Sequence, residues 1–240
     1  MNNKQQEPLS FFYNKYGVNL KEIDKIITGR KNTAIMLKNG NIGVCANFGY
    51  EISTNKDEIR KPDLNNIKHR VLLNAYYNAK LNYDNVFKER TDILDLIDFI
   101  KYNNIVMIGF FIPIVKKLKD NNIPLSIFDL LVNSKELTPL SKKDEFVSKA
   151  DAIILTSTTI FNKTLIDLIN KSNKADIFML GPSSIMHSDI FAYKNIKMVF
   201  GTVFNKYDNR VLDLIEKGAG TRKFLKLGKK VCLSARSYGV

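Results

Sequence analysis

The pattern of apolar and polar positions divides the chain into two regions that meet near residue 90. In the first region, Thr33–Lys38 and Ile42–Phe48 alternate like strands on either side of Asn39-Gly40. Asn-Gly tolerates a positive φ at both turn positions, so the pattern predicts a β-hairpin. Apolar residues at helical spacing predict a helix over residues 66–81, and an aromatic-rich segment predicts a short helix over residues 8–16. We therefore expect residues 1–88 to form a small α+β domain.

The second region alternates helical patterns with short, compact apolar runs. Short apolar strands separated by helices are typical of a parallel sheet that is covered on both faces. Residues 89–240 are therefore predicted to form a doubly wound, Rossmann-like parallel-sheet domain, which makes the whole protein α/β. The predicted strands are Ile105–Gly109, Leu125–Phe128, Ala152–Leu155, Ile177–Leu180 and Met198–Phe200, and the predicted helices are Asp92–Lys101, Pro113–Asn121, Thr164–Asn173 and Asp208–Lys217.

The composition is that of a globular protein, and it narrows the kinds of partner. The 240 residues are 45% hydrophobic and 25% charged, with a net charge of +13. Most lysines are dispersed, apart from a basic segment between Arg222 and Arg236. No zinc-finger, RRM-type or helix-turn-helix signature accompanies this charge, so nucleic acid is a disfavoured partner. The longest apolar runs have ~10 residues, whereas a membrane-spanning helix needs ~20. The polar N-terminus has no signal-peptide core, and we expect a cytoplasmic protein that does not enter the membrane.

Small, hydroxylated or glycine residues follow nearly every predicted strand of the second region. In an open α/β sheet, ligands bind at the carboxyl ends of the strands, and such residues allow a close backbone approach and supply neutral hydrogen-bonding groups. The alternative is that each loop holds ordinary helix caps and turn formers. The candidate ligand-binding residues at the strand ends are Gly109, Phe110, Pro113, Thr156, Thr158, Thr159, Asn162, Gly181, Pro182, Ser183, Gly201 and Thr202.

The first region adds a polar stripe that faces the same place. Arg70, Asn74 and Asn78 share one face of the predicted helix, beside its apolar face, where a second domain could meet it. The alternative is a solvated helix face. Thr33, at the start of the first hairpin strand, could add a hydroxyl. Thr33, Arg70 and Asn78 therefore join the candidate ligand-binding residues.

Motifs for familiar cofactors and catalysts are absent from the sequence. The loop from Gly109 to Pro113 is not G-x-G-x-x-G, and no phosphate-binding P-loop occurs. Asp129 and His187 are weak candidates for proton transfer, and a helix-start position is the alternative for His187. Cys45 and Cys232 are expected in the core, and no cysteine, histidine or acidic cluster has the spacing of a zinc site.

A set of short motifs follows in order along nearly the whole chain. They are Gly29-x3-Thr33-Ala34, Arg70 with Asn78-Ala79, Ile108-Gly109-Phe110 with Pro113, Ala150-Asp151 through Thr164, Leu180-Gly181-Pro182-Ser183, Gly201-Thr202, and Gly218-x-Gly220-Thr221 with Phe224. Together they resemble the motifs of the heavy-metal chelation domain family, a bacterial and archaeal group of largely uncharacterised proteins, with departures at Asp129, Ser157, Ile185 and Ala219. The resemblance implies an enolase N-terminal-like domain followed by a Rossmann-like domain, with the site in the cleft between them.

The function expected from the residues and the resemblance is binding of a metal, a metal chelate or a small anionic ligand in that cleft. Because the neutral candidates outnumber the strong metal ligands, Asp129, His187 and Asp189, a chelate or organic ligand is favoured over a bare soft metal. A divalent metal is the cofactor to test, and a homodimer is the assembly to test. The alternative is a transferase that uses a nucleotide-like cosubstrate such as S-adenosylmethionine, with Asp129 on the ribose.

Overall fold

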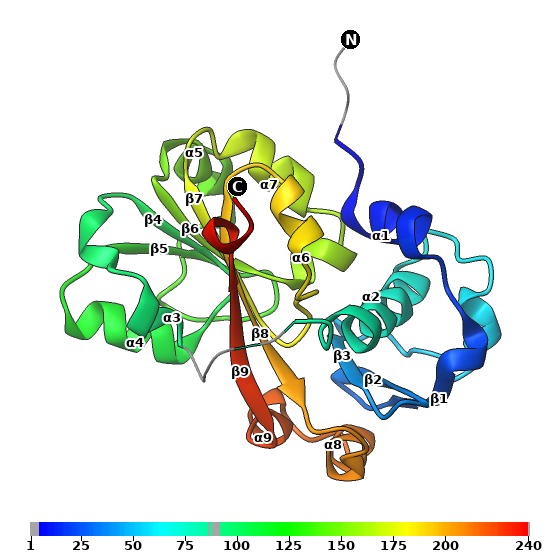
Figure 1. The fold of residues 1–240 in the computed structure, drawn as a ribbon. Helices are drawn as coiled ribbons and strands as arrows, with labels where there is room; N and C mark the ends of the chain where they lie inside the picture. The colour runs from blue at the N-terminus through cyan, green and yellow to red at the C-terminus, as the bar shows by residue number, and fades with distance from the viewer. Residues whose placement is uncertain (1–4, 86, 88–91, 240) are drawn as a thin grey trace.

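The structure is a computed structural model that describes residues 5–85, 87 and 92–239, and it contains two β-sheets (Figure 1). The chain begins with α1 (Pro8–Tyr16), whose bounds are those predicted. A three-stranded antiparallel sheet follows, with β1 (Ile23–Thr28), β2 (Asn32–Leu37) and β3 (Ile42–Ala46) in that order. The pairing of β2 with β3 confirms the Asn39-Gly40 hairpin. The α2 helix (Ile67–Leu81) confirms the third predicted element.

The second sheet has six strands and confirms the Rossmann-like prediction. Its order is β5-β4-β6-β7-β8-β9, and every pair among the first five strands is parallel. The last strand, β9, is antiparallel to β8. The strands are β4 (Ile105–Ile108), β5 (Leu125–Phe128), β6 (Ala152–Thr156), β7 (Asp176–Leu180), β8 (Ile196–Phe204) and β9 (Gly228–Ser234). The helices of this half are α3 (Ile93–Leu96), α4 (Ile112–Asp120), α5 (Lys143–Lys149), α6 (Thr158–Phe161), α7 (Leu165–Lys171), α8 (Asn209–Glu216) and α9 (Thr221–Leu225).

The prediction of one helix over Asp92–Lys101 is wrong. The segment forms the short α3 helix and then a separate 3₁₀ turn at Phe99–Lys101. Asp92 caps the first by accepting from the Leu94 N–H at 3.2 Å, and Asp98 caps the second by accepting from the Ile100 N–H at 3.2 Å. An aspartate that binds the backbone ahead of it starts a new turn and does not continue the old one. The predicted boundary between residues 88 and 89 lies outside the described residues.

The N-terminal sheet is covered on both faces, which explains why all six residues of β2 are buried. The α2 helix covers one face so closely that a Cβ on Gly43 would lie 2.1 Å from the Ala75 carbonyl oxygen. On the other face, apolar residues of α8 and α9 pack against β2 and β3, where Val211, Ile215 and Phe224 share a core with Ala34. Figure 1 shows β8 and β9 extending past the large sheet to bring α8 and α9 beneath β1–β3. The C-terminal half therefore supplies part of the N-terminal core.

Candidate functional site

The strand order places the point of divergence of the large sheet between β4 and β6. From β4 the chain crosses to β5 on one side, and from β5 it returns to β6 on the other, so the loops after β4 and β6 leave in opposite directions. Ligands of open α/β sheets bind in the crevice at such a point, outside the carboxyl ends of the strands. Gly109, the first residue after β4, has a φ of 100°, which favours glycine.

Three strand-end loops meet at this position. A Cβ on Gly109 would lie 3.0 Å from the Thr156 Cβ and 3.3 Å from the Phe111 ring. A Cβ on Gly181 would lie 3.9 Å from the Ser157 nitrogen. The loops after β4, β6 and β7 are therefore neighbours. We call the half-exposed surface formed by residues 109–111, Thr156, Thr158 and Gly181 the carboxyl edge.

The carboxyl edge offers hydrogen-bonding groups that the protein leaves available. The Thr156 and Thr158 hydroxyls lie 3.1 Å apart, and both residues are half-buried. Nearby, α4 begins after Phe111 without a side-chain cap. The N–H groups of Phe110 and Phe111 donate to no described residue. These two N–H groups precede the helix, and free backbone N–H groups beside the positive end of a helix dipole favour a negatively charged partner.

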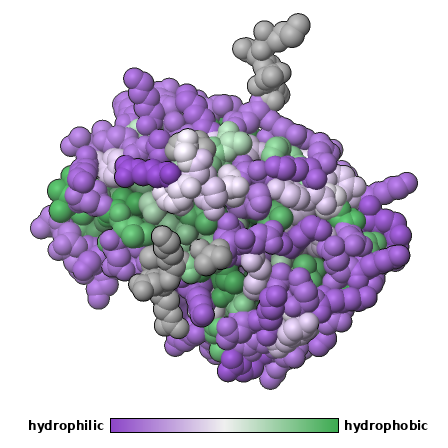
Figure 2. Space-filling model, viewed as in Figure 1, coloured by the Kyte–Doolittle hydropathy of each residue, from purple (hydrophilic) through white to green (hydrophobic). Residues whose placement is uncertain are grey.

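Exposed apolar residues border the carboxyl edge. Ile112, the first residue of α4, is 51% exposed, and Leu130 and Leu131, just past β5, are 73% and 68% exposed. Figure 2 shows hydrophobic surface on the side of the molecule that carries β5 and α3. These side chains give the surface next to the carboxyl edge an apolar character.

A second group of residues behind the carboxyl edge is buried and makes hydrogen bonds within the protein. Ser157 bonds to Ser184, and the Ser184 hydroxyl donates to the Phe200 carbonyl at 2.7 Å. Ser183 accepts from the Ala46 N–H at 3.1 Å, which joins β3 to the loop after β7. The Thr159 hydroxyl donates to the Thr156 carbonyl at 2.8 Å. Each of these four hydroxyl groups is buried and has a protein partner.

The polar stripe on α2 docks the helix onto the loop after β7. Asn74 donates to the Ser183 carbonyl at 2.9 Å, and Asn78 donates to the Pro182 carbonyl at 3.2 Å and the Val44 carbonyl at 2.8 Å. Asn82 donates to the Ser184 carbonyl at 3.0 Å and accepts from the Met186 N–H at 2.7 Å. Asn85 donates to the Met186 carbonyl at 2.6 Å. We call these four asparagines and residues 182–186 the α2 seam.

The seam joins the polar stripe to the second half of the chain and extends past residue 78 to Asn82 and Asn85. Asn82 continues the four-residue spacing of residues 70, 74 and 78, and this spacing was the signal that could have found it. The side-chain oxygens of Asn74 and Asn78 are buried without a partner among the described residues.

Arg70 and Thr33 are also engaged within the protein. All five N–H groups of Arg70 have acceptors: the Phe161, Ile160 and Leu64 carbonyls and both carboxylate oxygens of Glu7. The Arg70 side chain is 1% exposed. The Thr33 hydroxyl donates to the Asn47 side chain at 2.8 Å. Neither residue presents a free donor at the carboxyl edge.

The remaining candidate residues at the strand ends differ in their contacts and in their exposure. Asn162 accepts from the Thr164 N–H at 3.1 Å and from its hydroxyl at 2.7 Å, so it caps a turn. Gly201 lies against Met186, whose sulfur would be 2.7 Å from an added Cβ. Pro182 and Thr202 are half-buried, whereas Pro113 is exposed on the first turn of α4.

The two candidates for proton transfer, Asp129 and His187, lie in separate loops, and each accepts hydrogen bonds from the backbone of its own turn. The Asp129 Oδ1 atom accepts from the Leu131 N–H at 2.7 Å and the Val132 N–H at 3.0 Å. His187 begins a 3₁₀ turn, where its Nδ1 accepts from the Asp189 N–H at 3.2 Å, as the helix-start alternative expected. Burial holds the pKa of His187 below its ordinary value.

The described residues do not fit a bare heavy-metal ion. Within the ranges that the structure describes, no three His, Cys, Asp or Glu side chains gather in a group that could hold one. Burial raises the pKa of Cys45 and raises the pKa of Cys232 to about 12, so neither thiol readily becomes a thiolate ligand. The hydroxyl and amide oxygens of the carboxyl edge and the α2 seam are poor ligands for soft metals.

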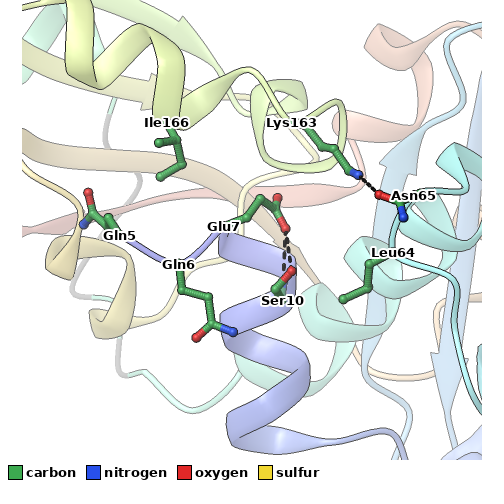
Figure 3. A pocket seen from close by; sticks show the side chains of 8 residues that line it. All are labelled: Gln5, Gln6, Glu7, Ser10, Leu64, Asn65, Lys163 and Ile166. Atoms are coloured by element: carbon green, nitrogen blue, oxygen red, sulfur yellow. Dashed lines mark hydrogen bonds between the residues drawn. The ribbon is translucent and has the colours of Figure 1, made fainter. Parts of the chain in front are cut away.

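Two hollows lie away from the carboxyl edge. One of about 550 Å³ lies between the segment at residues 5–10, Leu64, Asn65 and the segment at residues 163–166 (Figure 3). Another, of about 180 Å³, lies at the opposite edge of the large sheet, beside Asn104 and Pro124. No candidate ligand-binding residue lines either hollow. Among residues 5–85, 87 and 92–239, no helix has the length and apolar character needed to cross a membrane.

The fold and the carboxyl edge define an α/β protein in which a mostly parallel sheet carries a small antiparallel sheet against its strand-end loops. The family model described as "Putative heavy-metal chelation" matches residues 92–234, more than half of the chain, and the protein belongs to that family. This confirms the resemblance read from the sequence. No curated protein matches the chain.

Solved structures show the same fold. One is a protein with unknown function of this family from Pyrococcus horikoshii, with 19% identity, a TM-score of 0.75, and coverage of 88% of this chain and 92% of that one. Another, also of unknown function, is from Desulfitobacterium hafniense DCB-2, with 20% identity, a TM-score of 0.71, and coverage of 94% and 98%.

Proposed function

We propose that this protein binds a small anionic ligand, including a metal that arrives already chelated, at the carboxyl edge. The observation that carries the proposal is the pair of half-buried hydroxyls of Thr156 and Thr158 next to the uncapped start of α4. Hydroxyls and N–H groups donate to carboxylate or other oxyanion oxygens. Each hydrogen bond to a charged group contributes about 1.5–3 kcal/mol.

A chelate fits this surface better than a free ion does. The donors described above stabilise negative charge, whereas a metal ion needs electron pairs from thiolates, imidazoles or carboxylates. In a chelate, the organic ligand supplies those electron pairs and presents its outer oxygens to the protein. The exposed Ile112, Leu130 and Leu131 side chains would contact its carbon skeleton.

No comparison supports the alternative of a nucleotide-like cosubstrate. That hypothesis relied on Asp129 as an acceptor for ribose hydroxyls. One of its carboxylate oxygens is already held by two backbone N–H groups of its own turn.

The test is isothermal titration of the purified full chain with three probes: citrate, nickel(II) citrate and nickel(II) alone. We expect citrate or its nickel complex to bind and nickel(II) alone to bind at least about tenfold more weakly, which corresponds to about 1.4 kcal/mol. Gly109→Ala should weaken the binding, since its φ of 100° strains any other residue and an added Cβ would lie 3.0 Å from Thr156.

The matched control is Gly220→Ala, because a Cβ there meets nothing within 4 Å. Tight binding of nickel(II) alone, or equal citrate affinity in both glycine variants, would contradict the proposal.

A further inference from the structure

The larger of the two hollows, whose surface is mainly apolar, lies where three distant parts of the chain meet. Its walls are residues 5–10, which lead into α1, the loop at Leu64 and Asn65, and the segment at residues 163–166 (Figure 3). Its volume of about 550 Å³ lies within the range of small-molecule sites. It contains none of the residues of the carboxyl edge.

The negative charge of Glu7 in this hollow is neutralised by the buried Arg70. Both carboxylate oxygens of Glu7 accept from Arg70, and one of them also accepts from the Ser10 N–H at 3.1 Å and the Ser10 hydroxyl at 3.2 Å. Arg70 is buried behind Glu7 and takes no other charged partner among the described residues.

The positive charge of Lys163 has no such compensation. Its ammonium donates to the Asn65 side-chain oxygen at 2.6 Å, and this partner is neutral. Lys163 forms no ion pair with the described residues. Figure 3 shows the Lys163 and Asn65 side chains joined at the rim of the hollow. With two cations, Arg70 and Lys163, and one anion, Glu7, the hollow carries a net positive charge, and this charge lies on the solvent-exposed Lys163 at its rim.

The backbone of Lys163 is left-handed, with a φ of 66° directly after the C-cap of α6. A non-glycine residue in this region costs roughly 1–2 kcal/mol, and glycine or asparagine would reduce this cost. Five other non-glycine residues of the described chain also have a positive φ, so the conformation gives a stability readout for Lys163 and does not by itself mark a binding site.

We propose that this hollow is a second binding site, for a small carboxylate with a short apolar body. The carboxylate would bind the Lys163 ammonium and the Asn65 amide, whose N–H₂ group donates to no described residue. Leu64 and Ile166 provide apolar wall for the carbon skeleton. A carboxylate is favoured over an amine because the charge left uncompensated in the hollow is positive.

The test uses isovalerate as the probe and 3-methylbutanamide as its neutral counterpart, titrated into the ¹⁵N-labelled full chain and followed by NMR. We expect isovalerate to shift the amide signals of residues 5–10, 64–65 and 163–166, and the amide to shift them much less. Lys163→Met should weaken isovalerate binding at least about tenfold, whereas Lys163→Arg should retain it within about threefold.

Two further variants separate this site from folding and from the carboxyl edge. Lys163→Gly should lose binding while raising the melting temperature, because glycine relieves the left-handed strain. Thr158→Val, at the carboxyl edge, should bind isovalerate as the unchanged protein does. The inference is overturned if no shifts occur in these three segments at tens of millimolar isovalerate, if Lys163→Met binds equally well, or if the shifts lie only at the carboxyl edge.

Discussion

The α2 seam and the carboxyl edge are built from similar polar residues, yet they differ in what those residues are free to do. At the seam, Asn74, Asn78 and Asn82 are fully buried, and their amide groups hold the backbone of the loop after β7. At the carboxyl edge, Thr156 and Thr158 remain half-buried and bond chiefly to each other. The seam therefore holds the two halves together, and the carboxyl edge is the part where we propose that a ligand binds.

This difference shows that polar residues at strand ends fall into two kinds: those that bind other parts of the protein and those that stay in contact with solvent. Leaving a buried polar group unpaired costs about 1–3 kcal/mol, so the buried amide N–H groups of the seam bind backbone carbonyls, although the side-chain oxygens of Asn74 and Asn78 have no partner among the described residues. Only a group that keeps contact with solvent can exchange water for a ligand.

Removing Arg70 should produce the largest loss of stability. Arg70→Met deletes five hydrogen bonds and leaves the Glu7 carboxylate without its cation. Breaking a buried ion pair from one side costs about 3–5 kcal/mol. Urea unfolding should show this loss, whereas Arg60→Met, which breaks an exposed pair with Asp57, should change stability by less than about 1 kcal/mol. Equal effects of the two substitutions would contradict the structural assignment of Arg70.

Adding one carbon atom where α2 crosses β3 should have the next largest effect. In Gly43→Ala the new Cβ would lie 2.1 Å from the Ala75 carbonyl oxygen and 2.2 Å from the Ala79 nitrogen. Helix and strand must separate, and overpacking of this kind costs about 1–3 kcal/mol. Thermal unfolding should show a clear drop in the melting temperature. An unchanged melting temperature would mean that α2 does not lie this close to the N-terminal sheet.

Shortening one asparagine of the seam should lower stability by a similar amount. Asn82→Ala leaves the Ser184 carbonyl and the Met186 N–H without their buried partner, at about 1–3 kcal/mol. Hydrogen exchange should increase at residues 184–186 before the rest of the large sheet. Asn14→Ala, on the exposed face of α1, is the control and should leave exchange unchanged. Slow exchange at residues 184–186 in Asn82→Ala would show that the seam is not held by this side chain.

The smallest effect concerns pH. His187 has Asp189, Lys15 and Asp84 as charged neighbours, and burial is the main cause that lowers its pKa. Because the folded pKa lies below the unfolded value of about 6.5, the unfolded chain binds the proton more readily. The stability contributed by neutral His187 is therefore present above about pH 6.5 and is lost as the pH falls through the lower folded pKa.

Unfolding measured between pH 7 and 5 should show this loss, and His187→Asn, which keeps an acceptor for the Asp189 N–H, should show a shallower slope. Asp189 does not interfere in this window, because its own pKa is lowered from about 3.8. Identical slopes would contradict the burial argument.

Much of the fold could be predicted because its signals are local. The Asn39-Gly40 turn, the bounds of α1 and the apolar runs of the parallel strands depend on residues close together in the chain. The strand β1 escaped prediction because it alternates poorly, with a register shift between Ile23 and Lys25. The packing of α8 and α9 on the N-terminal sheet joins residues more than 150 positions apart, and no local sequence pattern predicts it.

The sequence could predict that the candidate site lies at the carboxyl ends of the strands, but it could not predict which contacts each residue makes there. Sequence spacing placed Arg70 and Asn78 at the junction of the two halves. It could not show that Glu7, 63 residues away, takes the Arg70 guanidinium. Nor could it separate Thr158, which stays half-buried, from Thr159, which is buried, because a single residue step in a short helix changes the direction of the side chain.

The division between the two regions is tested most directly by comparing Thr158→Val with Asn82→Ala in two measurements, the dissociation constant for nickel(II) citrate and the free energy of unfolding. We expect opposite outcomes in the two variants. Thr158→Val should weaken binding about tenfold or more and change stability by less than about 0.5 kcal/mol. Asn82→Ala should lower stability by about 1–3 kcal/mol and leave binding to the folded protein nearly unchanged. Loss of binding at unchanged stability in Asn82→Ala, together with normal binding by Thr158→Val, would contradict this division of tasks.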